Sequence, residues 1–217
     1  MKKRHLYTAA VLLTLSLSAC GQDSENITES SQAVETEASS DKELSLADIK
    51  SAGSWDGNLY ENEAAGISFN MPESWTASSD EDIAAFIETV QAKGTDYLAM
   101  AQDLETGEVM QIAVEDLSVT TPNLTDSMDE DMYIDALRSQ LDLNEEQGLE
   151  ITHVDEENAE LSLGGESYKG FTATMSANGQ SINQVYAVRK IDDKHMMTVI
   201  YITAEDAGTE VLEELFI

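Results

Sequence analysis

The sequence predicts an α+β fold of three layers (α/β/α), in which an antiparallel sheet carries helices on both faces. Most strand-like segments are joined by tight turns rather than by crossover helices, and Asn178-Gly179 is the strongest hairpin signal among them. Residues 196–202 (MMTVIYI) are apolar on both sides of a strand, so this strand needs cover on both faces of the sheet. Helical segments before and after the strands supply that cover.

Two short strands open the predicted domain, at residues 59–62 and 67–71, with a bend at Gly66 between them. The helix that follows is expected to begin at a capping box, Ser78-x-x-Glu81, and to end at Gly94. Apolar residues recur along this segment at i, i+3, i+4 and i+7, which places them on one helical face. They are Ile83, Phe86, Ile87 and Val90.

A hairpin is predicted next, with strands at 97–104 and 108–117 around the turn Glu105-Thr106-Gly107. A second capping box, Ser127-x-x-Glu130, is expected to begin a helix over 129–143. The side of this helix that faces the core is predicted to carry Tyr133, Ala136, Leu137, Gln140 and Leu141.

Several strands and a last helix complete the prediction. The strands are expected at 149–155, at 159–163 (separate from 166–176 or fused with it), at 180–191 and at 195–203. The motif Thr203-x-x-Asp206 is expected to begin the last helix, whose buried residues would be Ala207, Val211, Leu212 and Leu215.

The first twenty residues carry a targeting signal. Three basic residues, Lys2, Lys3 and Arg4, precede an apolar stretch of 12 residues at 6–17, which is too short to span a membrane. The motif Leu17-Ser18-Ala19-Cys20 resembles the lipobox of bacterial lipoproteins. This resemblance implies cleavage before Cys20 and a diacylglyceryl group on its thiol, which would anchor the chain in a membrane with two acyl chains.

Composition divides the rest of the chain into a tether and a domain. Residues 21–43 contain no aromatic side chain and are rich in Ser, Glu and Thr, so they cannot bury enough apolar surface to fold. The expected boundaries are a signal peptide at 1–19, a lipidated cysteine with an acidic tether at 20–50, and one domain at 51–217. Within the tether, 44–50 can form one short helical turn.

The charge balance excludes whole classes of partner. The chain has 11 Lys and Arg against 43 Asp and Glu, which gives a formal net charge of -32. Such a polyanion is repelled by nucleic acids and by anionic lipid headgroups. We therefore expect no nucleic-acid partner, and we expect membrane attachment through Cys20 alone.

One motif indicates a known family. The pattern Tyr60-x-Asn62-x-x-x-Gly66-Ile67-Ser68-Phe69-x-Met71-Pro72-x-x-Trp75 resembles the opening motif of the PsbP-like family. That family includes an extrinsic protein of photosystem II and many bacterial lipoproteins, and it shares its fold with a nuclear-import factor that acts on the GTPase Ran. The resemblance implies the fold across residues 59–217. It implies no activity, because its residues have structural roles and a fold does not specify a function.

Reactive side chains in the arrangement of a known catalytic motif are not found in the sequence. His153 and His195 lie on strand-like segments without metal-ligand spacing, and no serine lies in a nucleophile motif. We therefore expect no enzyme activity and no cofactor. Asp126, Asp129 and Asp131 are weak candidates for binding Ca²⁺, and the alternative is that they stabilise a helix N-terminus.

Aromatic residues supply the candidate binding site. Trp55, Tyr60, Phe69 and Trp75 can line a ligand groove, although aromatic residues also fill cores. The function expected is a non-catalytic binding or accessory module at the outer face of the bacterial cytoplasmic membrane, with an envelope or surface protein as its partner. The alternatives are a carboxylate- or metal-dependent hydrolase and a Ca²⁺-dependent envelope or adhesion protein.

Overall fold

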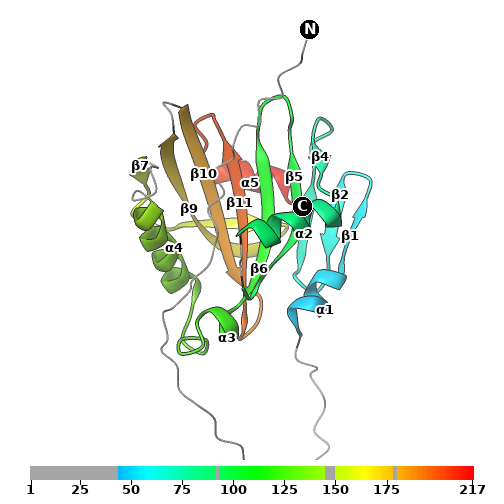
Figure 1. Cartoon of the computed structure of the whole chain (residues 1–217), viewed down its shortest axis with the longest axis vertical. Helices are drawn as coiled ribbons and strands as arrows, with labels where there is room; N and C mark the ends of the chain where they lie inside the picture. The colour runs from blue at the N-terminus through cyan, green and yellow to red at the C-terminus, as the bar shows by residue number, and fades with distance from the viewer. Residues whose placement is uncertain (1–43, 91–92, 145–149, 178–179) are drawn as a thin grey trace, which may run out of the picture.

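The computed structural model describes residues 44–90, 93–144, 150–177 and 180–217. Strands dominate, and helices lie outside them (Figure 1). In chain order the elements are α1 (Leu46–Ser51), β1 (Gly53–Asp56), β2 (Leu59–Asn62), β3 (Ile67–Asn70), β4 (Thr76–Ala77), α2 (Asp80–Val90), β5 (Thr95–Gln102), β6 (Val109–Asp116), α3 (Leu117–Thr120), α4 (Glu130–Asn144), β7 (Glu150–Val154), β8 (Ala159–Leu163), β9 (Glu166–Ala177), β10 (Gln180–Lys190), β11 (His195–Thr203) and α5 (Glu210–Leu215).

A large antiparallel sheet forms the middle layer, with the strand order β4-β5-β6-β11-β10-β9-β7. Strand β8 also pairs with β9, on the same side as β7. Both predicted hairpins are present: β5 pairs with β6, and β9 pairs with β10 from Ala177 opposite Gln180 onward. The turn residues Asn178 and Gly179 lie outside the described residues. The predicted α+β class with an antiparallel sheet is therefore confirmed.

The central strand β11 is covered on both sides, as its composition predicts. All nine of its residues are buried. Alternate residues belong to two different cores, because successive side chains of a strand point to opposite faces. Met197, Val199 and Tyr201 join one cluster, whereas Met196 and Ile200 join the other.

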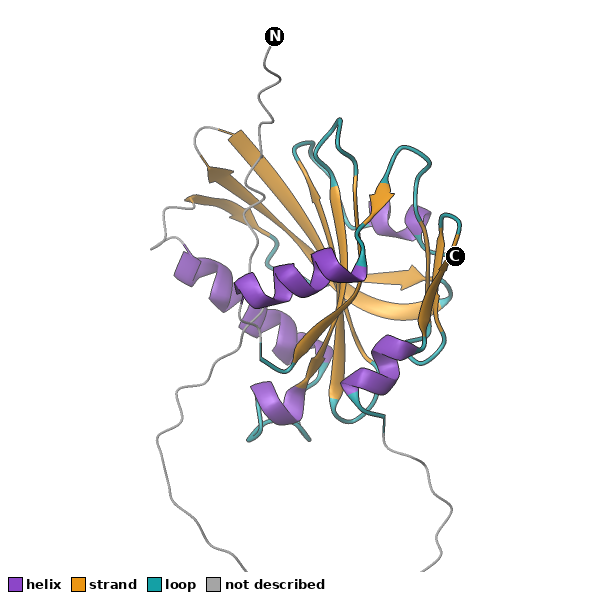
Figure 2. Cartoon of the chain, turned by 45° about the vertical axis from the view of Figure 1, so that its right-hand side comes forward, coloured by secondary structure: helices purple, strands orange, loops and turns teal. Residues whose placement is uncertain are grey.

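Different elements cover the two faces of the large sheet (Figure 2). Helix α4 packs on one face through Tyr133, Ile134, Leu137 and Leu141, and α2 packs on the same face beside β5. The other face is covered by α1, α5 and a separate three-stranded sheet with the order β1-β2-β3. The sequence indicated β2 and β3 but not β1, so it did not predict this second sheet.

Three predicted helix starts differ from the structure. Helix α2 is capped by Ser79 with Asp82, one residue after the expected Ser78-x-x-Glu81 box. Helix α4 is capped by Asp129, which accepts a hydrogen bond from the Met132 N–H at 2.9 Å, rather than by Ser127. Helix α5 begins after Thr209 and not after Thr203.

Helix α1 belongs to the folded part. Its Ile49 is fully buried in the core that also contains Tyr60 and Phe69, and Leu44 and Leu46 pack against the same core. Ser45 and Asp48 form a capping box at its start. The expected tether of 20–50 therefore ends earlier, because residues 44–50 bury apolar side chains that a solvated linker would leave exposed.

Candidate ligand groove

An open groove of about 770 Å³ lies between the small sheet and the edge of the large one. Its volume falls in the range of small-molecule and peptide sites, about 300–1,000 Å³. Four parts of the chain that are distant in sequence form its walls: helix α1, strand β1, the first turn of α2 and strand β5. Tyr60 of β2 also lines it.

Trp55 and Tyr60 give the groove an aromatic wall. The two residues lie opposite each other on β1 and β2, with ring centroids 5.2 Å apart and planes tilted by 54°. Tyr60 is 2% exposed, whereas Trp55 is only partly buried. A partly buried tryptophan beside a groove presents a large apolar surface to a ligand at a low cost in conformational entropy.

Gly53 makes room for this wall. A Cβ atom at position 53 would lie 2.1 Å from the Tyr60 hydroxyl oxygen and 2.9 Å from Asn62 Nδ2. The Asn62 side chain donates to the Tyr60 hydroxyl at 3.2 Å and to the Ile49 carbonyl at 2.8 Å. The missing side chain therefore allows a hydrogen-bonded junction that connects β2 to α1 beneath the groove.

An ion pair lines the groove where α1 meets β5. Lys50 of α1 donates to Asp96 Oδ1 at 2.6 Å, and the same oxygen accepts the Tyr97 backbone N–H at 3.0 Å. Register with β6 shifts between Tyr97 and Ala99, which is a bulge, and Leu98 lines the groove from this irregular position. Lys50 is the only basic residue among those that line the groove, and it is paired.

Carboxylates make the groove weakly acidic. Asp80, at the start of α2, is exposed, and it lines the groove beside Ser78 and Ser79. Burial raises the pKa of Tyr60, the Asn62 hydrogen bond partly offsets that rise, and the negative charge of Asp80 adds to it. Asp80 is thus close enough to the aromatic wall for its charge to act there.

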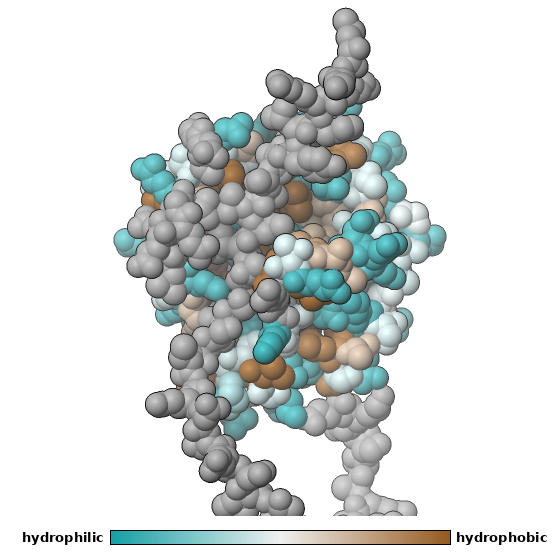
Figure 3. All heavy atoms as spheres, in the orientation of Figure 1, coloured by the Kyte–Doolittle hydropathy of each residue, from teal (hydrophilic) through white to brown (hydrophobic). Residues whose placement is uncertain are grey.

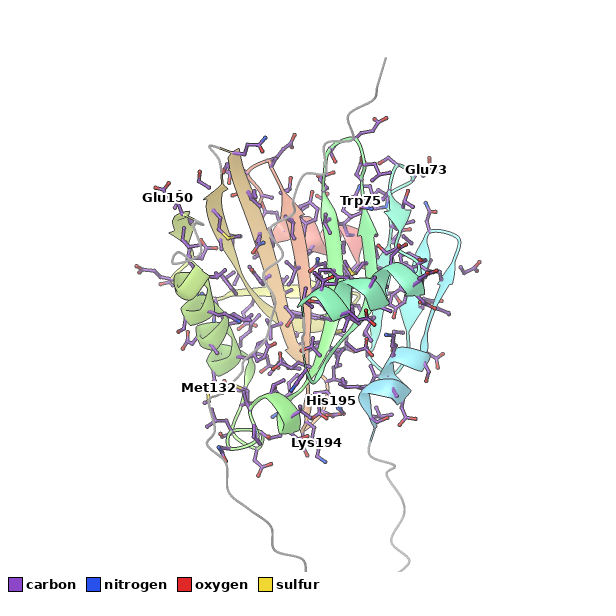
Figure 4. All side chains as sticks on the ribbon, in the orientation of Figure 1. Glu73, Trp75, Met132, Glu150, Lys194 and His195 are labelled. Carbon is purple, nitrogen blue, oxygen red and sulfur yellow. The ribbon has the colours of Figure 1, made fainter. Side chains whose placement is uncertain are left out.

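The four predicted aromatic residues do not form one site. Phe69 is 1% exposed and packs between Trp55 and Phe216, at centroid distances of 6.1 and 5.3 Å. Trp75 stacks on Tyr201 at 6.1 Å and lies near β4, at the end of the sheet away from α1 (Figure 4). Trp55 and Tyr60 therefore line the groove, and Phe69 and Trp75 fill the core.

Two of the three predicted calcium candidates, Asp129 and Asp131, have separate structural roles. Asp129 caps α4, and Asp131 accepts hydrogen bonds from Asn158 and Lys169. These bonds to Lys169 and Asn158 lower the pKa of Asp131. Asp126 is exposed in the preceding loop. Within the described parts of the chain, no group of three or more His, Cys, Asp or Glu side chains gathers in a way that could hold a metal ion.

Both histidines of the domain have carboxylate partners. His195 is 2% exposed, and its Nδ1 lies 2.9 Å from both oxygens of Asp192, at the turn beside α3 (Figure 4). Burial would raise the pKa of Asp192, but hydrogen bonds from His195 and from the Lys194 N–H lower it overall. His153 is exposed and lies 3.1 Å from Asp155. Neither histidine lines the groove.

The visible face of the described chain is mostly hydrophilic, with hydrophobic residues in small separate groups (Figure 3). No helix in the described ranges is both long and apolar enough to cross a membrane. The proposed anchor, Cys20, and the rest of the signal lie outside the described residues.

The fold and the groove define an α+β protein with an open groove that has an aromatic wall, and this fold can be compared with known structures. No protein-family model matches the sequence, and a search of curated proteins found no match. Among solved structures the chain is similar to cyanobacterial PsbP from Synechocystis sp. PCC 6803, at 16% identity and a TM-score of 0.43, covering 71% of this chain and 87% of that one. This neighbour bears the name of the family that the opening motif resembles.

Two further similar structures come from other bacteria. One is LpqN, described as involved in cell envelope biogenesis of Mycobacterium tuberculosis, at 13% identity and a TM-score of 0.37, covering 80% of this chain and 92% of that one. The other is a protein of Bacteroides thetaiotaomicron, at 11% identity and a TM-score of 0.37, covering 70% of this chain. The chain spans 43% of that protein's length.

Proposed function

We propose that this protein is a non-catalytic binding module of the bacterial envelope, held at the outer face of the cytoplasmic membrane by a lipid on Cys20. The groove between α1, β1, α2 and β5 is its binding site. The observation that carries the proposal is the combination of a large open groove with an aromatic wall, Trp55 over Tyr60, in a chain with a lipoprotein-like start.

The chemistry of the groove favours binding over catalysis. Its basic residue, Lys50, is neutralised by Asp96, and the hydroxyls of its wall belong to serines and to Tyr60, with no histidine in the lining. A nucleophile needs a base within hydrogen-bond reach, and a pair of catalytic carboxylates needs one with a raised pKa. The groove supplies an apolar platform and hydrogen-bonding groups, which suit recognition.

Site-specific photo-crosslinking in living cells tests this proposal. A photo-reactive amino acid at Ser54, which is exposed in the groove, is expected to give a discrete adduct on the membrane-associated protein. The matched control places the same group at Thr152, which is exposed on β7 at the other edge of the sheet. The Ser54 adduct should disappear when Trp55→Ala is added.

Equal adducts from Ser54 and Thr152, or a Ser54 adduct that persists without Trp55, would contradict a specific groove. The two alternative functions have their own signatures. A melting temperature that rises in millimolar Ca²⁺ would favour the calcium-dependent envelope protein. A crosslinked ligand that is found in the adduct as a cleaved product would favour the hydrolase.

A further inference from the structure

An open strand edge borders the groove. Strand β1 has β2 as its single strand neighbour, so half of its backbone N–H and C=O groups point away from the small sheet. Among the described residues, no backbone or side-chain hydrogen bond is found on that outer side of Gly53–Asp56. Unpaired strand edges of this kind are templates for the addition of another strand.

The groove reaches this edge, and it also extends over the face of the small sheet where Tyr60 of β2 lines it. Gly53, Ser54 and Trp55 all line it, and they are consecutive. Successive side chains of a strand point to opposite faces, so three consecutive residues that line one space place part of that space beside the strand. The backbone of β1 is therefore accessible from the groove together with the side chain of Trp55.

The opposite border is closed to strand addition. Strand β5 pairs with β4 at Ala101 and Gln102 only, but the Tyr97 N–H of β5 already donates to Asp96, and Lys50 binds the same carboxylate. Native edges are often protected by charged side chains and bulges, and β5 has both here. A ligand strand would therefore pair with β1 and lie against the side chains of β5 and α2.

Charge selects the side chains of such a ligand. Asp80 is exposed in the groove without a basic neighbour in the lining, because Lys50 is paired with Asp96. The whole chain carries 43 acidic residues against 11 basic ones, so its field attracts cationic partners and repels acidic ones. The partly exposed ring of Trp55 also attracts Lys or Arg side chains through its π face.

The chain's own tether does not fit this site. Residues 21–43 contain seven acidic residues and one basic residue, so they would meet Asp80 and Asp96 with like charge. Resting on the function proposed above, we propose that the groove binds a basic, extended segment of a partner protein, which adds as a strand to the free edge of β1.

Four synthetic probes test this on the full chain in detergent micelles. The first is the peptide acetyl-(Lys-Val)₃-amide. The second and third are the same peptide with backbone N-methyl groups on alternate residues. One carries them on the odd-numbered residues and the other on the even-numbered residues. Each therefore lacks the backbone donors along one of its two edges, with its charge unchanged. The fourth is spermidine, which has positive charge and no peptide backbone. Binding is measured by tryptophan fluorescence, to which Trp55 and the core residue Trp75 both contribute, and by titration calorimetry.

The expected result is that the unmodified peptide binds and that at least one N-methylated peptide binds about tenfold or more weakly. A tenfold loss corresponds to about 1.4 kcal/mol. Spermidine should bind at least as weakly as that N-methylated peptide. If both N-methylated peptides or spermidine bind as tightly as the parent peptide, the site recognises charge and not a strand, and the inference is wrong.

Two variants locate the site. Asp80→Asn should weaken binding of the unmodified peptide and reduce the dependence of that binding on salt. Trp55→Ala should weaken binding of the same peptide about tenfold. Glu150→Gln is the matched control, because Glu150 is exposed on the distant edge strand β7 (Figure 4). Failure of the unmodified peptide with a persistent Ser54 crosslink would overturn strand addition and leave the proposed function standing.

Discussion

Gly53 shows how a single atom shapes the groove. The space that its Cβ would occupy is taken by the Tyr60 hydroxyl, 2.1 Å away, and by Asn62. We predict that Gly53→Ala lowers the free energy of unfolding by about 1–3 kcal/mol, because an added methyl group must displace a buried tyrosine. Urea denaturation followed by circular dichroism measures this change.

Ser54→Ala is the control for that substitution. Ser54 is exposed on the same strand, so its replacement should change stability by less than about 0.5 kcal/mol. Equal stability of the two variants would mean that Tyr60 can move away from Gly53 at little cost, and the junction between β2 and α1 would not be rigid.

Glu115 is a second residue whose effect on stability can be identified. It is 2% exposed on β6, and Tyr133 of α4 donates to its Oε2 at 2.7 Å. Its Oε1 has no hydrogen-bond partner among the described residues, and neither have the nearby Tyr97 and Thr198 hydroxyls. Burial raises the pKa of Glu115, and the hydroxyls of Thr120 and Tyr133 partly offset this rise.

A raised pKa in the folded state determines how stability depends on pH. The unfolded chain releases the Glu115 proton near the ordinary value of 4.5, before the folded chain does, so this residue reduces stability as pH rises above that value. We predict that Glu115→Gln unfolds at higher urea concentration than the original protein at pH 7.5, and that the difference shrinks toward pH 4. A difference that stays constant with pH would contradict a raised pKa.

The sequence indicated part of the groove at the residue scale. Trp55 and Tyr60 were recognisable as aromatic residues near the start of the domain, and they meet because they face each other across β1 and β2. In the sequence, Phe69 and Trp75 are equivalent to Trp55 and Tyr60, because no sequence pattern distinguishes an aromatic residue that lines a groove from one that fills the core. Lys50 and Asp96 were missed, since their contact joins positions 46 residues apart.

At the scale of elements, helix α1 extends the domain beyond its predicted start. Ile49→Ala should lower the free energy of unfolding by about 2–5 kcal/mol, because it leaves a cavity in the core shared with Tyr60 and Phe69. Thermal denaturation measures the effect. Ser51→Ala, at an exposed position of the same helix, is the control. Equal stability of both variants would mean that residues 44–50 belong to the tether and not to the folded domain.

The helix N-termini show why a local motif can predict a helix without predicting its first residue. The segment Ser78-Ser79-Asp80-Glu81-Asp82 offers two capping boxes in adjacent registers, and packing of Ile83 on β5 accompanies the second. At the C-terminal helix, Thr203 remains part of β11, where it is 3% exposed. The sheet therefore extends into the position where the sequence placed a cap.

At the scale of the whole molecule, the large sheet was predictable because hairpin turns and a doubly apolar strand constrain it. The small sheet was not, because β1 is four residues long and alternates only between partly buried and exposed positions. The groove exists only where these two sheets and two helices meet. Its position is therefore a property of the tertiary arrangement, which no single segment encodes.

The proposed membrane attachment also concerns the whole molecule. We predict that Cys20→Ser leaves the chain uncleaved or releases it from the membrane fraction, because the thiol is the expected site of the lipid. Cell fractionation and mass spectrometry of the N-terminus measure this. A Cys20→Ser protein that still fractionates as a mature, acylated species would disprove the anchor.

The most direct test of the binding surface is amide hydrogen exchange of the full chain with and without acetyl-(Lys-Val)₃-amide. Strand addition predicts slower exchange in Gly53–Asp56 of β1, with no change in the distant hairpin of β9 and β10. Protection that appears elsewhere, or a bound peptide that leaves the exchange of β1 unchanged, would contradict the account.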